Sequence, residues 1–315
     1  MRKMKKHKTG RPSGKKAYLK DNIQLLFMYS PVLVLLAVFS YWPMYGLILS
    51  FKNYKVTDGI WGSEWVGLKN FEFFFTSKDL FRVLRNTLGL NFLFIFAGLA
   101  AAVAFALLMF EVKKARHVKL YQTVSILPNF ISWVAVSFMV YGLLEYNRGM
   151  INHLIQLLGG ERIRFYEEAG WWPGILLLVN LWHSVGMGSI IYYAALLSAD
   201  QELYEAADID GAGKLQKIWY ISIPQLIPIM TIRTIMSIGN IFRSDFGMFY
   251  NVPRNIGALY RTTDVIDTYV YRALMEVGNI GMSSAVGMFQ SVVCFITLIL
   301  TNKSAGKISP ENTLF

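Results

Sequence analysis

The sequence predicts an all-α, polytopic membrane protein with six transmembrane helices. Of its 315 residues, 54% are hydrophobic and only 16% are charged, whereas about a quarter of the residues in a soluble protein carry charge. Its mean hydropathy is +0.39, and six apolar stretches reach the roughly 20 residues that a membrane-spanning helix requires. Disorder is excluded as well, because disordered chains are poor in hydrophobic residues.

The predicted spans follow one another without a separate soluble domain or an internal repeat. The first one follows a basic segment, but its apolar run is too long for a secretory signal peptide, so we interpret it as an uncleaved anchor. The six spans are predicted at Gln24–Ser50, Asn86–Phe110, Leu120–Leu144, Trp172–Leu197, Pro224–Arg243 and Gly281–Thr301.

Six spans place both termini on one side of the membrane, and the basic residues indicate which side. The two termini and the two loops on their side hold 17 Lys and Arg against 8 acidic residues, whereas the three loops on the other side hold 12 of each. Since cytoplasmic loops are enriched in Lys and Arg, both termini are expected in the cytoplasm.

The chain therefore divides into three parts. These are a basic cytoplasmic tail (residues 1–23), a six-helix transmembrane domain (24–301) with a cytoplasmic loop at 198–223, and a cytoplasmic C-terminal tail (302–315). The basic N-terminal tail is expected to lie against the anionic headgroups of the lipid bilayer. It offers almost no aromatic side chains for stacking on bases, so we expect no nucleic-acid partner.

The loop at residues 198–223 has the pattern of a helical hairpin. Asp200 is a suitable N-cap for a first helix, and Gly211 and Gly213 end that helix. A second short helix is expected over residues 214–220.

The same loop carries a motif with fixed spacing. It reads Glu205-Ala206-Ala207, two residues, then Asp210-Gly211-Ala212, and it continues to Pro224, which is expected to begin the fifth span. The pattern resembles the EAA signature of permease subunits of binding-protein-dependent ABC importers, which also precedes the penultimate span. Trp219 and Ile223 stand where Phe and Leu are more usual, but both preserve the apolar character.

Other segments extend the resemblance over nearly the whole chain. Leu127–Ser132 and Gly186–Ser189 look like the carbohydrate-importing members, and Tyr146–Asn152 together with the basic tail is similar to the subgroup for complex or uronic-acid oligosaccharides. The resemblance implies the type I ABC importer permease fold in a bacterial cytoplasmic (inner) membrane. It also implies a second permease subunit as heterodimer partner, two ATP-binding subunits, an extracytoplasmic solute-binding protein and a carbohydrate substrate. Because the motif is shared across substrates, a permease for a non-sugar solute remains an alternative.

In that family the loop is a coupling helix, which docks on the ATPase and transmits its closure to the spans. A hairpin that merely reverses the chain is the structural alternative. The residues to which the resemblance assigns ATPase coupling are Glu205, Ala206, Ala207, Asp210, Gly211, Ala212 and Pro224.

Neither catalysis nor a cofactor is expected of this chain. Gly211–Leu215 looks superficially like a phosphate-binding loop, but Asp208 replaces the first Gly of a Walker A motif and Leu215 replaces its Ser or Thr, so ATP hydrolysis is assigned to a separate subunit. The single Cys294 and four scattered His predict no disulfide and no metal site, and they argue against a membrane-embedded enzyme. The predicted spans contain no Asp or Glu, which argues against a secondary transporter.

Polar and aromatic residues inside the spans are the candidates for a substrate path, because a polar group that faces lipid is unfavourable. Inter-helix packing is the alternative for each of them, and it is also the preferred interpretation of the small-residue stripe Gly98, Ala102 and Ala106, with a conduit wall as its alternative. Arg233 is unusual, because it has no intramembrane acid to pair with and must face water, another subunit, backbone carbonyls or an anionic sugar. The path candidates are Asn180, Trp182, His183, Tyr192, Arg233, Asn240 and Gln290.

Overall fold

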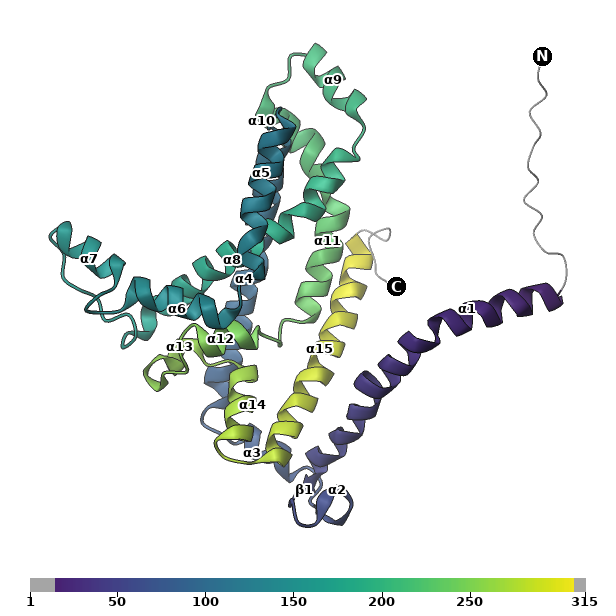
Figure 1. Cartoon of the computed structure of the whole chain (residues 1–315), viewed down its shortest axis with the longest axis vertical. Helices are drawn as coiled ribbons and strands as arrows, with labels where there is room; N and C mark the ends of the chain where they lie inside the picture. The colour runs from purple at the N-terminus through teal and green to yellow at the C-terminus, as the bar shows by residue number, and fades with distance from the viewer. Residues whose placement is uncertain (1–14, 309–315) are drawn as a thin grey trace.

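The computed structural model describes residues 15–308, and almost all of its regular structure is helical (Figure 1). Elements labelled η are 3-10 helices, except for the π-helical η1 and η5. In chain order the elements are α1 (Lys15–Leu36), η1 (Ala37–Tyr41), η2 (Trp42–Phe51), β1 (Lys52–Asn53), α2 (Gly59–Gly62), β2 (Glu64–Trp65), α3 (Lys69–Phe75), α4 (Leu80–Phe110), α5 (Ala115–Ile126), η3 (Leu127–Phe130), α6 (Trp133–Leu144), α7 (Met150–Leu157), η4 (Ala169–Trp171), α8 (Trp172–Leu197), α9 (Gln201–Ile209), α10 (Lys214–Lys217), η5 (Ile218–Ser222), α11 (Ile223–Gly239), α12 (Phe246–Asn251), η6 (Gly257–Leu259), α13 (Tyr260–Thr263), α14 (Ile266–Met275) and α15 (Ile280–Ile308).

The all-α membrane architecture predicted from the sequence is confirmed. Within residues 15–308, five helical segments are long and apolar enough to cross a membrane, and there are six if a strongly bent pair of helices is counted as one span. The five are Leu25–Phe51, Leu80–Phe110, Ala169–Leu197, Lys214–Gly239 and Ile280–Gly306.

The third predicted span, Leu120–Leu144, is not one continuous helix. The segment Ala115–Phe130 and helix α6 are bent by 98° relative to each other. Pro128 lacks an amide N–H and lies in the 3-10 turn before the bend. Ser132 is extended, and its hydroxyl accepts a hydrogen bond from the amide of Ala135 at 3.3 Å, which begins α6 in the new direction. Hydropathy predicts the apolar length but not this break.

The fifth predicted span also differs at both of its ends. The helical segment begins at Lys214, ten residues before Pro224, and passes through the π-turn η5 into α11 without interruption. Pro224 therefore lies inside the segment. It comes directly after the π-turn, where the hydrogen bonding of the helix is already irregular, so the N–H that proline lacks is tolerated there. The helix ends at Gly239, so Arg243 lies beyond it, in the turn that leads to α12.

The centre of the bundle is built from α4, α8, α11 and α15. Ala102 and Ala106 of α4 are buried against Tyr192 and Leu196 of α8 in one apolar cluster, as expected for packing. Gly98 and Ala102 also line a cavity, so the small-residue stripe combines the packing role with its alternative, a conduit wall. Helix α5 also packs closely on α8, because a Cβ at Gly186 would lie 1.9 Å from a backbone oxygen of α5.

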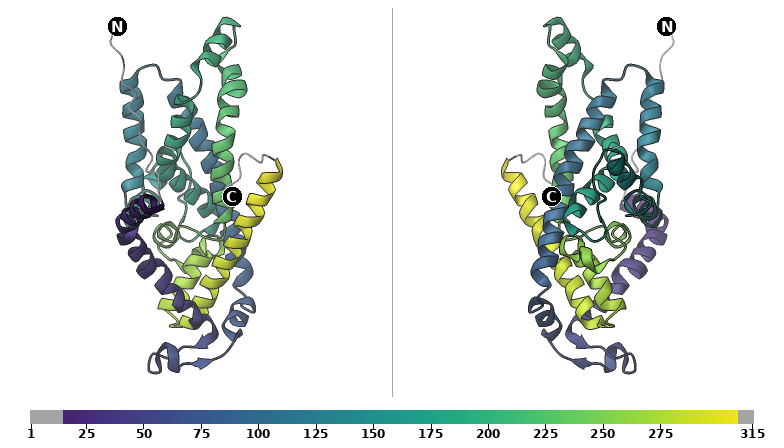
Figure 2. Two further views of the ribbon diagram at one scale, coloured as in Figure 1. Left: turned by 90° about the vertical axis from the view of Figure 1, so that its right-hand side faces the viewer. Right: turned by 90° about the vertical axis from the view of Figure 1, so that its left-hand side faces the viewer.

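The two ends of the molecule differ in architecture (Figures 1 and 2). The hairpin of α9 and α10 forms one tip, and the β1–β2 pair lies at the opposite end with α2. Near the end with the strands, the fully buried Asp264 forms ion pairs with Arg82 of α4, at 2.8 Å, and with Arg272 of α14. This network fixes the return loop between α11 and α15 to α4.

Helix α1 stands apart from the bundle over most of its length (Figure 1). In the segment Leu25–Phe51, which comprises the second half of α1 with η1 and η2, none of the residues in the apolar 18-residue window is buried. The helix begins at Lys15, before the predicted span start at Gln24. Residues 1–14 of the predicted N-terminal tail and 309–315 of the predicted C-terminal tail lie outside the described residues.

Candidate functional site

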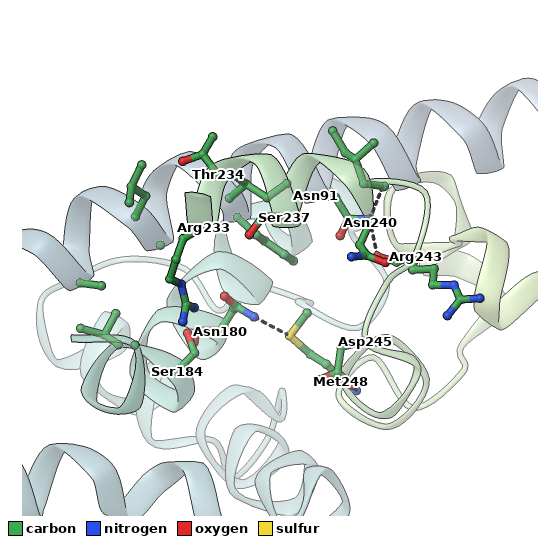
Figure 3. Close-up of a pocket in the computed structure, with 18 of the residues that line it drawn as sticks. Asn91, Asn180, Ser184, Arg233, Thr234, Ser237, Asn240, Arg243, Asp245 and Met248 are labelled. Carbon is green, nitrogen blue, oxygen red and sulfur yellow. Dashed lines mark hydrogen bonds between the residues drawn. The ribbon is translucent and has the colours of Figure 1, made fainter. Parts of the chain in front are cut away.

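A cavity of about 350 Å³ lies among α4, α8, α11 and the turn that leads into α12 (Figure 3). One part of its wall is apolar, formed by residues such as Phe94, Leu99 and Phe249. The rest carries amides and hydroxyls, so the cavity offers hydrogen bonds at the depth of the membrane-spanning helices. The uncharged amide and aliphatic hydroxyl side chains on its wall are Asn91, Asn180, Ser184, Thr234, Ser237 and Asn240, and the wall also carries Tyr192 and the charged Arg233, Arg243 and Asp245.

Helix periodicity explains why these groups converge. Arg233, Ser237 and Asn240 are spaced by four and three residues, so they lie on one face at the end of α11. Asn180, Ser184 and Gly188 are spaced by four on α8 and form the facing wall.

Several of these side chains form hydrogen bonds within their own helix, and these bonds leave some of their polar atoms free to bind a ligand in the cavity. The Asn240 side-chain amide donates to the Met236 carbonyl at 3.0 Å, and the Ser184 hydroxyl donates to the Asn180 carbonyl at 2.7 Å. The Asn180 amide lies 3.8 Å from the Met248 sulfur, which is a weak acceptor. Among residues 15–308, no hydrogen bond is made to the side-chain oxygen of Asn180 or Asn240, so both oxygens are available as acceptors.

Asn91 has a positioning role on the cavity wall. Its side-chain amide is within hydrogen-bond distance of the carbonyls of Ile241 and Arg243, at 2.7 and 3.1 Å, and of the Ser244 hydroxyl at 3.0 Å. One amide of α4 therefore holds the turn in which α11 ends, and this turn closes one side of the cavity.

The second functional region is the hairpin at the tip of the molecule. The Asp200 carboxylate accepts a hydrogen bond from the amide of Glu202 at 3.0 Å and caps α9, as predicted. Gly211 has φ +75°, a left-handed conformation that favours glycine. It reverses the chain between α9 and α10.

The hairpin is braced on the helices that line the cavity. The Tyr204 hydroxyl is 3.0 Å from the Ser222 hydroxyl in the π-turn, and its ring packs 5.5 Å from that of Phe110 at the end of α4. Lys214 forms an ion pair with Glu111 at 3.2 Å. The hairpin is thus tied to the ends of both α4 and α11.

Comparison with known proteins shows which family contains a chain with this cavity and this hairpin. The sequence family described as "binding-protein-dependent transport system inner membrane component" matches residues 98–309, about two thirds of the chain. This chain belongs to that family.

One curated relative of this permease is the polygalacturonan/rhamnogalacturonan transport system permease protein YteP of Bacillus subtilis (strain 168). The two are 37% identical over 288 residues, which cover 91% of this chain and 89% of the relative. The fold matches, at a TM-score of 0.84 and 30% identity, a chain of a bacterial ABC transporter involved in the import of the acidic polysaccharide alginate, and it covers 93% of this permease and 98% of that chain. It matches equally well the bacterial alginate ABC transporter in complex with an alginate pentasaccharide-bound periplasmic protein, covering 93% and 97% of the two chains. The type I ABC permease fold predicted from the motif is therefore confirmed.

Four of the seven path candidates predicted from the sequence meet at the cavity of the permease: Asn180, Tyr192, Arg233 and Asn240. The other three do not line it. Trp182 lies on the outward side of α8, with 44% of its surface exposed. His183 and Gln290 hold the structure together instead.

His183 stabilises the bend between α5 and α6. Its Nε2 lies 3.1 Å from the carbonyl of Ile131, and its ring stacks on that of Trp133 with centroids 4.0 Å apart. The bend leaves a backbone carbonyl without a helical partner, and His183 supplies a hydrogen bond to it.

Gln290 fixes α15 to the return loop. Its side-chain amide donates to the Phe242 carbonyl at 2.6 Å and lies 3.2 Å from both carboxylate oxygens of Asp267. Burial raises the pKa of the Asp267 carboxyl above its usual range, and the hydrogen bonds from Ser244 and Gln290 oppose that rise.

Sequence reasoning did not single out Thr234, Ser237 or Asp245, which also line the cavity. The helical spacing of Arg233, Ser237 and Asn240 indicates which face of α11 is polar, and it could have identified Ser237. Asp245 lies two residues beyond the predicted end of the fifth span, so it is not among the polar residues of the spans.

Proposed function

We propose that this chain is a permease subunit of an ATP-driven, binding-protein-dependent importer of carbohydrates. The observation that carries the proposal is the physical connection between a polar intramembrane cavity and an exposed helical hairpin through α4 and α11. The relative YteP and the alginate transporters, whose substrates are polysaccharides, support a saccharide substrate. Neutral amides and hydroxyls beside apolar walls suit a sugar, which presents hydroxyls on its edges and C–H groups on its faces.

The hairpin is proposed to dock on a separate ATP-binding subunit. Its tip exposes apolar side chains, among them Ile209 at 87% and Leu215 at 71%, and exposed apolar surface marks an interaction site. Ala206 is exposed as well, so a partner can approach the backbone of α9. The residues proposed for coupling are those of the motif: Glu205, Ala206, Ala207, Asp210, Gly211, Ala212 and Pro224.

The transport cycle follows from this geometry as alternating access. ATP-driven closure of the partner subunits moves the hairpin, and the contacts of Tyr204 and Lys214 pass that movement to α4 and α11. Because both helices line the cavity, their movement changes which side of the membrane it faces. ATP is hydrolysed by the partner, and this chain contributes half of the path.

The protein is proposed to span a bacterial inner membrane. The end with the hairpin and both termini are proposed to lie on the cytoplasmic side. The same end carries the short loop between α4 and α5, which contains Lys113 and Lys114, and the first turn of α5, which contains Arg116. These basic residues agree with the enrichment of Lys and Arg in cytoplasmic loops. The binding protein then meets the end that carries β1, β2 and the return loop. A cysteine at Ile209 that reacted with an impermeant maleimide from outside intact cells would contradict this orientation.

The coupling proposal is tested with Ile209→Glu in the assembled transporter. A carboxylate at the tip disrupts an apolar contact, so we expect ATPase association and saccharide uptake in proteoliposomes to fall about tenfold or more, since one lost apolar anchor contributes about 1.5–3 kcal/mol. Membrane insertion is expected to remain normal.

Leu158→Glu is the matched control, because Leu158 is equally exposed, at 88%, but follows α7. Equal losses in both variants, or none in Ile209→Glu, would contradict docking at the hairpin. An intact transporter that imports a non-sugar solute but no saccharide would overturn the carbohydrate assignment alone.

A further inference from the structure

The cavity contains a positive charge that the described part of the chain does not neutralise. Arg233 lies on α11, ten residues after its first residue, and points from that helix toward Asn180 and Ser184 of α8 (Figure 3). Within residues 15–308 it has neither an ion-pair partner nor a hydrogen bond, and its side chain is exposed to the cavity. An arginine within a membrane-spanning helix is unfavourable unless water, a partner or a ligand solvates it.

The one carboxylate on the cavity wall does not serve as its counter-ion. Asp245 accepts a hydrogen bond from the Trp133 indole N–H at 2.8 Å through one oxygen, and from the amide of Met248 at 3.1 Å through the other. The second bond caps α12. Both oxygens are therefore engaged in holding α6 and α12 together.

Arg243, the other arginine on the wall, is directed elsewhere. Its guanidinium donates to the Ser291 hydroxyl of α15 at 3.2 Å, and its side chain points away from Arg233 (Figure 3). Arg233 is thus the cation that remains for a ligand within the described cavity.

The groups around Arg233 complete a site for an anion that also bears hydroxyls. An arginine guanidinium presents paired N–H donors that match the two oxygens of a carboxylate. Asn180 and Ser184 face it across the cavity, and Thr234 and Ser237 follow it on α11. These uncharged groups suit the hydroxyls of a sugar ring rather than a second charge.

We infer that this cavity selects saccharides that carry an anionic group, and that Arg233 binds that group during passage. The inference rests on the proposed function and specifies its substrate class. The shared chemistry is an oxyanion on a sugar, whose source is the carboxylate of a uronic acid or a phosphate ester.

The test compares matched substrates in proteoliposomes that contain the complete transporter. Uptake and substrate-stimulated ATP hydrolysis are measured with an oligogalacturonide, with its methyl-esterified neutral counterpart and with a sugar phosphate. The wild-type protein should import an anionic substrate faster than the neutral one, and the better anion identifies the source of the charge.

Arg233→Gln should lower uptake of the anionic substrate about tenfold or more, because a hydrogen bond to a charged group contributes about 1.5–3 kcal/mol. Uptake of the neutral substrate should change little. Arg233→Lys keeps the charge and should retain a preference for the anion, although it loses the paired geometry.

Arg116→Gln, at an exposed arginine of α5 that does not line the cavity, is the charge control, and it should leave the ratio of anionic to neutral uptake unchanged. Equal effects of Arg233→Gln on both substrates, or a wild-type protein that prefers the neutral saccharide, would overturn the anion inference and leave carbohydrate import standing. Absence of any saccharide uptake in a transporter that still couples ATP hydrolysis to another solute would overturn the proposed function itself.

Discussion

Gly186 is a position at which one missing side chain decides how two helices meet. It lies in the middle of α8, where α5 approaches so closely that a Cβ would lie 1.9 Å from the Ser125 carbonyl oxygen and 2.8 Å from the amide of Ile126. Both contacts are with backbone, which cannot swing aside as a flexible side chain can. Close approach of small residues is a common basis of helix association in membranes.

Replacement of Gly186 by Ala should therefore destabilise the permease. Because α5 has to move outward to admit the methyl group, we expect a loss of about 1–3 kcal/mol, measured as a lower midpoint of thermal unfolding in detergent. Gly174→Ala is the control on the same helix, since a Cβ there meets no atom within 4 Å. An unchanged midpoint for Gly186→Ala would show that α5 and α8 are not packed as closely as described.

At the scale of single elements, the hairpin and the π-turn η5 act together. Tyr204 reaches from α9 to Ser222 in η5, and Lys217 reaches back to Asp208 with an N–O distance of 2.7 Å. π-turns within helices often occur at functional sites. Here the turn lies where the hairpin joins the helix that carries Arg233.

A change at Tyr204 can distinguish the docking of the ATPase on the hairpin from the transmission of its movement to the spans. Tyr204→Phe removes the hydroxyl that bonds Ser222 but leaves the ring beside Phe110, so the ATPase should still bind. We expect saccharide uptake per ATP hydrolysed to fall several-fold, because a hydrogen bond of about 1 kcal/mol is lost between the moving parts. The ratio is measured in proteoliposomes, and Tyr220→Phe, at an 80% exposed tyrosine of η5, is the control. An unchanged ratio in Tyr204→Phe would exclude this contact from the coupling route.

At the scale of the whole molecule, the apolar segment Leu25–Phe51, which includes part of α1 with η1 and η2, is largely left uncovered by the rest of residues 15–308. Phe39 and Trp42, near the junction of η1 and η2, are 72% and 79% exposed. We propose that the second permease subunit packs against this surface, in keeping with the heterodimer expected for the family.

A photoreactive phenylalanine analogue at position 39 tests this packing. Irradiation of the assembled transporter should produce one cross-linked product that contains both permeases. The same variant expressed without its partner permease supplies the control, in which that product must be absent. Cross-links to lipid alone in the complete transporter would show that α1 faces the bilayer.

Hydropathy predicted the apolar segments well because burial in lipid depends on composition and length. It did not predict the bend after Pro128 or the early start of the fifth span at Lys214, since those depend on which backbone groups find partners in neighbouring helices. The same distinction separates the path candidates. A helix turns by about 100° per residue, so Asn180 faces the cavity whereas Trp182, two residues later, faces outward. The amino-acid composition of a span does not reveal which of its faces is turned toward the cavity. A helical spacing of polar residues, such as that of Arg233, Ser237 and Asn240, reveals this in part.

Helix α4 runs without a break from the cavity wall at Gly98 to the hairpin contact at Phe110. Twelve residues of α-helix span about 18 Å, so a tilt of about 10° about one end displaces the other by about 3 Å, roughly the width of a water molecule. Under the proposed docking of the hairpin on an ATPase, α4 would act as a stiff lever, in which a small angular movement at the hairpin displaces the cavity wall by about that distance. Such a lever moves the cavity wall by tilting one intact helix, so α4 does not have to unfold locally.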